Sequence, residues 1–113
     1  MDEVTNLQAE ILRSLAHPRR LLIMRRLDKG PCEVGALAAE LGMSQPNLSQ
    51  HLAVLRSTGL VDAVRDGREI RYRLVDPDVI TACMIIAGSI VMTLHFYDLR
   101  RRAEAATPTE PAE

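Results

Sequence analysis

Apolar residues recur at helical spacing up to about residue 58, then alternate with charged residues, and finally form one long apolar run. The helical spacing predicts four helices in the first part of the chain. Pro18 suits the first turn of the second helix, Gly30-Pro31 ends it, and Gly42 allows a tight turn before the fourth. We expect these helices over residues 4–15, over 18–27, from Cys32 or Glu33 to 41, and from 45 to a stop at Gly59.

The third and fourth helices, within residues 34–61, predict a helix-turn-helix, whose second helix can lie in the major groove of DNA. Leu48, Leu52 and Leu55 share one face of that second helix. Its other face is polar and suited to hydrogen bonds with base edges and phosphates. Because any exposed helix has a polar side, the flanking elements must decide between recognition and simple exposure. The candidate DNA-contacting residues of this face are Ser44, Gln45, Asn47, Ser49, Gln50 and His51.

A hairpin, the wing of a winged helix, is expected after Gly59. Asp66-Gly67 is a strong hairpin-turn signal, and residues 69–74 alternate between charged and apolar side chains as a half-buried strand does. Arg65 and Arg68 flank the turn, where they can contact phosphates or a minor groove. Arginines at such a place also keep an edge strand soluble. The position directly after a helix-turn-helix favours the role in DNA binding.

A long helix is expected from Val79 to about Arg102, and it has no charged residue as far as Tyr97. That length is compatible with a membrane span. Burial in a dimer interface is the favoured interpretation, because the run includes polar residues such as Ser89 and His95 and because no other long apolar segment accompanies it.

The 113 residues, 47% hydrophobic and 26% charged, suit one soluble domain of mainly helical α+β class. We expect this DNA-binding and dimerisation domain over residues 1–103 and a disordered tail over 104–113. The net charge of −1 gives no general attraction to DNA, so binding must rest on local arginines. Two cysteines and no secretory signal pattern favour a cytoplasmic setting.

An enzyme is not expected, because the chain has no paired acid and base, nucleophile motif or phosphate loop, and no cofactor is expected either. A winged helix that binds another protein instead of DNA is the competing class, and the low net charge would suit it.

The order of elements resembles the ArsR/SmtB family of bacterial winged-helix repressors over about residues 5–100. The resemblance implies a homodimer, paired through its first and last helices, that binds a double-stranded operator with dyad symmetry and is released by a chemical signal. The similarity rests on residues 15–21 (LAHPRRL), 44–52 (SQPNLSQHL), 55–61 (LRSTGLV), and 67–68 (GR) before 72–74 (YRL).

The sensor sites of known family members are not intact in this chain, and no metal site is expected. Two carboxylates with a serine and a thioether are a poor set for zinc. The aligned positions hold Asp76, Asp78, Ser89 and Met92 for zinc-type members, Glu33-Val34-Gly35 for arsenite-type members, and Arg25 and Val91 for persulfide-sensing members.

Cys32 and Cys83 are the remaining sensor candidates. At the start of the third helix, the helix dipole would favour the thiolate of Cys32. The hypothesis is that Cys32, together with Cys83, responds to a thiol-reactive oxidant, a sulfur species or a thiophilic metal. Two alternatives stay open: both cysteines are simply small buried residues, or a hydrophobic ligand or protein partner acts through the last helix, near Ala87-Gly88-Ser89.

Overall fold

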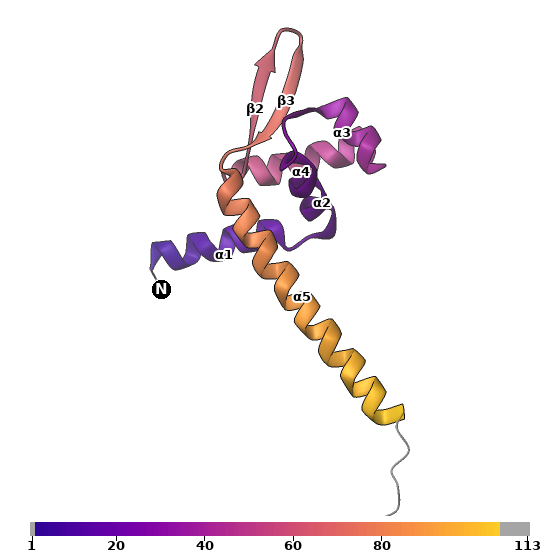
Figure 1. Cartoon of the computed structure of the whole chain (residues 1–113). Helices are drawn as coiled ribbons and strands as arrows, with labels where there is room; N and C mark the ends of the chain where they lie inside the picture. Colours follow the sequence, from indigo (N-terminus) through magenta and orange to yellow (C-terminus); the bar gives the residue numbers. More distant parts are fainter. Residues whose placement is uncertain (1, 107–113) are drawn as a thin grey trace, which may run out of the picture. The chain divides into compact units, whose positions relative to one another are not determined.

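The structure is a computed structural model that describes residues 2–106 (Figure 1). The chain divides into two compact units, Met1–Ile80 and Thr81–Glu113, and each is described by itself. The first unit has the predicted winged helix-turn-helix fold. The elements are α1 (Glu3–Leu15), α2 (Pro18–Leu27), β1 (Cys32–Glu33), α3 (Val34–Leu41), α4 (Gln45–Ser57), β2 (Val61–Asp66), β3 (Glu69–Leu74) and α5 (Pro77–Ala106).

Local sequence signals set the ends of the helices around the turn. Gly42 ends α3 in the left-handed conformation, with φ of 63°. Ser44 then caps α4, because its side chain accepts a hydrogen bond of 3.3 Å from the backbone N–H of Asn47. In α2, His17 is the cap, and its Nδ1 accepts a hydrogen bond of 3.1 Å from the backbone N–H of Arg19.

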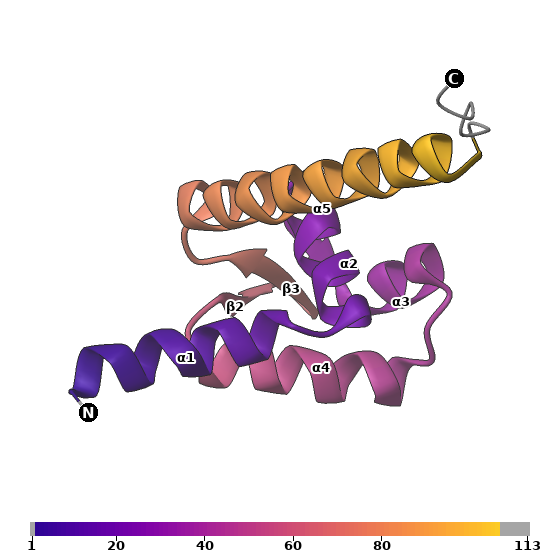
Figure 2. The ribbon, with the colours of Figure 1, turned by 90° about the horizontal axis from the view of Figure 1, so that it is seen from below.

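The core of the first unit is built from the inner faces of α2, α3 and α4, while α1 packs against α2 and α4 (Figure 2). The predicted leucine stripe of α4 is confirmed, since all three leucines are buried. Truncating one such leucine to alanine typically costs about 2–5 kcal/mol. The buried stripe fixes which face of α4 points outward. The largest fully buried side chains are Ile23, Met24, Leu37, Leu48, Leu52, Leu55 and Ile80.

The sheet has three antiparallel strands in the order β1-β3-β2. β2 and β3 form the predicted hairpin, which turns at Gly67 with φ of 63° and projects from the helices of this unit (Figure 1). Val61 pairs with Leu74 at its base, and both are buried, whereas Asp66 pairs with Glu69 at its tip, where both are exposed. The side chains of the hairpin therefore become more exposed from its base at the core to its tip.

Strand β1 corrects the sequence prediction that a helix begins at Cys32 or Glu33. Cys32 lies opposite Tyr72 in the sheet, and Glu33 lies opposite Arg71. The Glu33 carboxylate caps α3, since it accepts hydrogen bonds of 2.9 Å and 3.0 Å from the backbone N–H groups of Gly35 and Ala36. The helix therefore begins one residue later, at Val34, because these two residues are held in the sheet by β3.

The second unit contains most of α5, which extends to Ala106 and so passes the predicted end near Arg102. The rest of the predicted disordered tail, residues 107–113, lies outside the described residues. By length and composition, the segment Ile80–Ala106 could also cross a membrane. Its large apolar side chains are exposed in the single chain and include Ile85, Ile86, Ile90, Val91, Met92, Leu94, Phe96, Tyr97 and Leu99.

Candidate nucleic-acid interface

The outward face of α4 carries the polar residues that the sequence predicted. Ser44, Gln45, Ser49 and Gln50 are exposed, while Asn47 and His51 are half-buried. The amide groups of Gln45 and Gln50 can each donate and accept a hydrogen bond, and the hydroxyl of Ser49 can do the same. The structure thus brings the predicted residues to the N-terminal half of α4, where four of them are exposed and Asn47 and His51 flank the buried leucines.

His51 is less open than the sequence suggested, because its ring lies against the ring of His17. The two ring centroids are 4.6 Å apart and the ring planes are tilted by 50°. Burial lowers the pKa of His51, and the neighbouring His17, Arg20 and Arg19 lower this pKa further. The imidazole of His51 is therefore held in its neutral form near pH 7, as a half-buried group between α2 and α4.

His17 is a neighbour of this face that was not predicted. Its place before Pro18 is a signal for the start of a helix, and His17 does cap α2. Nothing in helical spacing relates it to α4, because the contact depends on how α2 and α4 pack. Of the two arginines that follow it, Arg19 is exposed and Arg20 is half-buried.

The wing pairs most of its charges internally. Arg73 lies 3.5 Å from the carboxylate of Asp62, its direct partner on β2. Arg71 lies 3.5 Å from Asp66 and 3.6 Å from Glu69. Such exposed pairs contribute little to stability, about 0–1 kcal/mol each, but they neutralise the acids of the hairpin.

Arg65 and Arg68 differ from these arginines. Both are exposed, and within residues 2–106 neither takes part in an ion pair at 4.0 Å or less. Arg65 lies in β2 and Arg68 directly follows Gly67 in the turn. Within the wing, the positive charge available to a phosphate is thus at its outer part.

The sensor candidate Cys32 does not occupy the site that the sequence predicted. Its side chain is 5% exposed in β1, and its Sγ–H donates a hydrogen bond of 3.5 Å to the backbone carbonyl of Glu33. The N-terminus of α3 is occupied by the Glu33 carboxylate, whose pKa is lowered by hydrogen bonds from the backbone of Gly35 and Ala36 and by the nearby charge of Arg71. Cys32 is therefore not the residue at the start of α3, and its predicted activation by the helix dipole is wrong.

Cys83, the second candidate, lies in α5, where its side chain is half-buried. Both cysteines are free thiols. Asp76 and Asp78, which align with zinc ligands of the family, lie at the start of α5, where Asp76 accepts a hydrogen bond of 3.0 Å from the backbone N–H of Asp78. Across the described part of the chain, no three His, Cys, Asp or Glu side chains form a group that could hold a metal ion.

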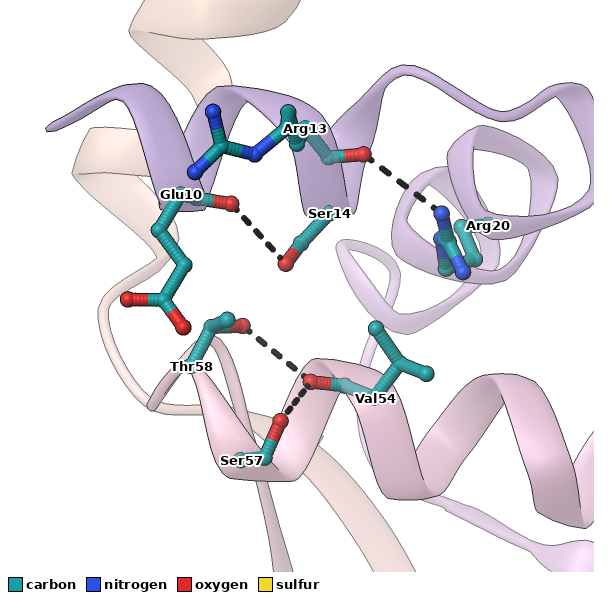
Figure 3. A pocket seen from close by; sticks show the side chains of 7 residues that line it. All are labelled: Glu10, Arg13, Ser14, Arg20, Val54, Ser57 and Thr58. Atoms are coloured by element: carbon teal, nitrogen blue, oxygen red, sulfur yellow. Dashed lines mark hydrogen bonds between the residues drawn. The ribbon is translucent and has the colours of Figure 1, made fainter. Parts of the chain in front are cut away.

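A cavity of about 240 Å³ lies where α1, α2 and α4 meet (Figure 3). Its hydroxyl groups are already bound to backbone carbonyls: Ser14 donates to Glu10 over 3.1 Å, and Ser57 donates to Val54 over 2.7 Å. The lining therefore contributes to the packing of the three helices and presents no activated nucleophile. The residues that line it are Glu10, Arg13, Ser14, Arg20, Val54, Ser57 and Thr58.

Comparison with known proteins agrees with this architecture. The family model for bacterial regulatory proteins of the arsR family matches residues 17–63, from the cap of α2 into β2. The biofilm growth-associated repressor of Agrobacterium fabrum is 47% identical over 68 residues, which make up 60% of this chain and 58% of that repressor. The match thus spans less than two thirds of the length of that relative.

Solved structures resemble nearly the whole described chain. The structure of Rv0081 from Mycobacterium tuberculosis superposes with a TM-score of 0.77 at 33% identity and covers 88% of this chain and 99% of that one. A homodimeric winged helix-turn-helix DNA-binding domain from Mycobacterium bovis gives a TM-score of 0.74 at 31% identity and covers 82% of this chain and 86% of that one. The matching family and these relatives are regulatory proteins and not enzymes. The chain belongs to the arsR family of bacterial regulatory proteins.

Proposed function

We propose that this protein is a homodimeric transcriptional repressor that binds a double-stranded operator in the cytoplasm and leaves it in response to a chemical signal. The observation that carries the proposal is the exposed polar face of α4, followed in the chain by a wing with two arginines outside its ion pairs. α4 lies in the major groove, and the wing follows the adjacent backbone or minor groove.

Each group on this surface has a chemical role. The amides of Gln45, Asn47 and Gln50 suit bidentate hydrogen bonds with adenine. The hydroxyls of Ser44 and Ser49 and the imidazole of His51 suit base edges or phosphates. The guanidinium groups of Arg65 and Arg68 neutralise phosphates, which gives affinity without reading the sequence.

The second copy of the chain is proposed to cover the apolar surface of α5. Exposed apolar side chains lie along this helix from Ile85 to Leu99, and an apolar surface of that extent requires a partner. The similar domain from Mycobacterium bovis is a homodimer, which supports this assignment. Val4, Leu7 and Leu12 of α1 are also exposed, and α1 is proposed as the second helix that pairs with the partner. Under this proposal α5 contacts protein and not a membrane.

The release signal is proposed to act at thiols. Cys83 is the more accessible of the two cysteines, so we place the first reaction with an oxidant, sulfur species or thiophilic metal there, with Cys32 as the buried second thiol. The alternative is a hydrophobic ligand or protein partner that binds α5, and the exposed apolar side chains of that helix favour it as the second candidate.

Binding to the DNA upstream of the protein's own gene tests the proposal. We expect preference for a fragment with dyad symmetry over random DNA of the same length, and a steep loss of affinity between 50 and 200 mM salt, since about six to ten phosphate contacts reduce affinity by about 10³–10⁵ over that range. No binding to any DNA at low salt would refute the proposal and leave a protein-binding module as the function.

A further inference from the structure

The ring of His17 is held in place by its own helix. His17 is the N-cap of α2, with extended backbone angles of −146° and 128°, and Pro18 follows it in the first turn. Its Nδ1 accepts the hydrogen bond from the backbone N–H of Arg19. Because that lone pair is occupied, the neutral ring carries its proton on Nε2, and the ring cannot turn over without breaking the cap.

This fixed ring lies against one member of the proposed recognition surface. The centroid of His51 is 4.6 Å from that of His17, at a tilt of 50°, which is the spacing and geometry of an aromatic pair. His51 comes from α4, so the contact joins the cap of α2 to the recognition helix. Gln45, Ser49 and Gln50 are exposed, and their orientation is not fixed in this way.

The charged groups around the pair are mainly cationic. From α2, Arg19 and Arg20 lie close enough to His51 to affect its protonation, beside the ring of His17. From α1, the backbone carbonyl of Arg13 accepts a hydrogen bond of 3.4 Å from Arg20, which keeps that guanidinium beside the pair. This surrounding keeps His51 neutral, and a neutral imidazole can both donate and accept one hydrogen bond.

We propose that His17 is a positioning residue for DNA recognition: its capped imidazole fixes the orientation in which His51 of α4 contacts a base pair. His17 is outside the recognition helix and contributes through His51. The inference rests on the proposed DNA binding and adds to it a residue that determines specificity.

Two substitutions separate the cap from the ring contact. His17→Asn keeps a good N-cap residue but removes the ring, whereas His17→Phe keeps a ring but cannot cap α2. We expect His17→Asn to reduce discrimination at the base pair that His51 contacts by about two- to tenfold, with little change in Tm. His17→Phe should lower Tm and keep more of that discrimination than His17→Asn does, because a ring still covers His51 although the cap no longer holds it. The contacted base pair is the one at which His51→Ala loses discrimination among operators with single substitutions.

Two controls make the assignment specific. In a His51→Ala background, His17→Asn should have no further effect on discrimination, because the partner ring is already absent. In the DNA-free protein, NMR titration should show that His17→Asn raises the pKa of His51, since this change removes the ring that covers part of it. Equal loss on every DNA sequence would indicate a purely structural role and would overturn the inference.

The two proposals fail in different ways. Operator binding by the wild-type chain, with unchanged discrimination in His17→Asn, would overturn the positioning role alone. Absence of DNA binding by the wild-type chain would refute the proposed function and, with it, the positioning role, even if the titration confirmed the contact between the rings.

Discussion

The ring of His17, the cap of α2, lies 4.6 Å from the ring of His51 in α4, centroid to centroid. The start of one helix is therefore in direct contact with the surface that another helix presents. The contact buries part of the His51 ring and places it near Arg19 and Arg20. Both effects favour the neutral imidazole, which has consequences for stability as well as for DNA binding.

His51 should make folding stability depend on pH below neutrality. Its pKa is lowered in the folded protein, so the unfolded chain binds the proton more readily. The contribution of His51 to the free energy of unfolding is present above the pKa of the unfolded state, near 6.5. It is lost as the pH falls through the pKa of the folded state. Urea unfolding should show that the free energy of unfolding decreases less from pH 8 to pH 5.5 for His51→Gln than for the wild type. An equal decrease in both proteins would contradict this role of His51.

Gln50→Ala should weaken operator binding by about 1–3 kcal/mol if the amide makes a base contact. Because Gln50 is exposed, the folded protein should retain its stability. Affinities for the operator and for random DNA of the same length, measured at one salt concentration, check this prediction. A loss of the same size on both DNAs would show that Gln50 does not read the sequence.

Arg68→Ala should weaken binding to all sequences alike and lower the slope of log affinity against log salt by about one. The same is expected of Arg65→Ala. A matched control is the double variant Asp62→Ala with Arg73→Ala, which removes an ion pair of the wing without changing its net charge. The control should leave the salt slope unchanged. If it lowers the slope as much as Arg68→Ala does, the distinction between paired and available arginines does not hold.

Ile90→Asp in α5 should convert the dimer to a monomer, because it puts a charge into the proposed apolar interface. Glu104→Gln, near the polar end of the same helix, serves as the control and should remain dimeric. Sedimentation velocity measures both. A wild-type chain that is monomeric in buffer and sediments with lipid vesicles would instead assign α5 to a membrane.

Cys83→Ser should prevent release from the operator by at least one thiol-reactive agent, and Cys32→Ser should have a smaller effect, because Cys32 is more buried. The agents to compare are peroxide, polysulfide, arsenite and cadmium, with operator binding as the readout. Unchanged release of both variants by every agent that releases the wild type would exclude thiol sensing. Failure of every agent to release the wild type would likewise favour a ligand that binds α5.

The predictable parts of the fold are those with local causes. Pro18 and Ser44 mark helix starts, the leucines of α4 define its buried face, and Asp66-Gly67 specifies the hairpin. The pairing of Asp62 with Arg73 follows from the register that this turn sets, so it too could be predicted from the sequence.

The missed features depend on residues far apart in the chain. The two-residue strand β1 exists because Cys32 and Glu33 pair with β3, and no local pattern marks so short a strand. The same applies to the contact between His17 and His51, which requires α2 and α4 to be packed together. The placement of Cys32 was wrong for this reason, while the buried leucine stripe of α4 was predicted correctly because its period is local.

Glu33 joins the first helix of the helix-turn-helix to the wing. Its carboxylate caps the first helix of the helix-turn-helix, and its backbone pairs with Arg71 in a strand of the wing. Under the proposed function, the spacing between the contacts of α4 and those of the wing is thus set within the protein. Only DNA whose groove width and helical repeat match that spacing can meet both contacts without deformation, so the shape of the double helix becomes part of what the protein selects.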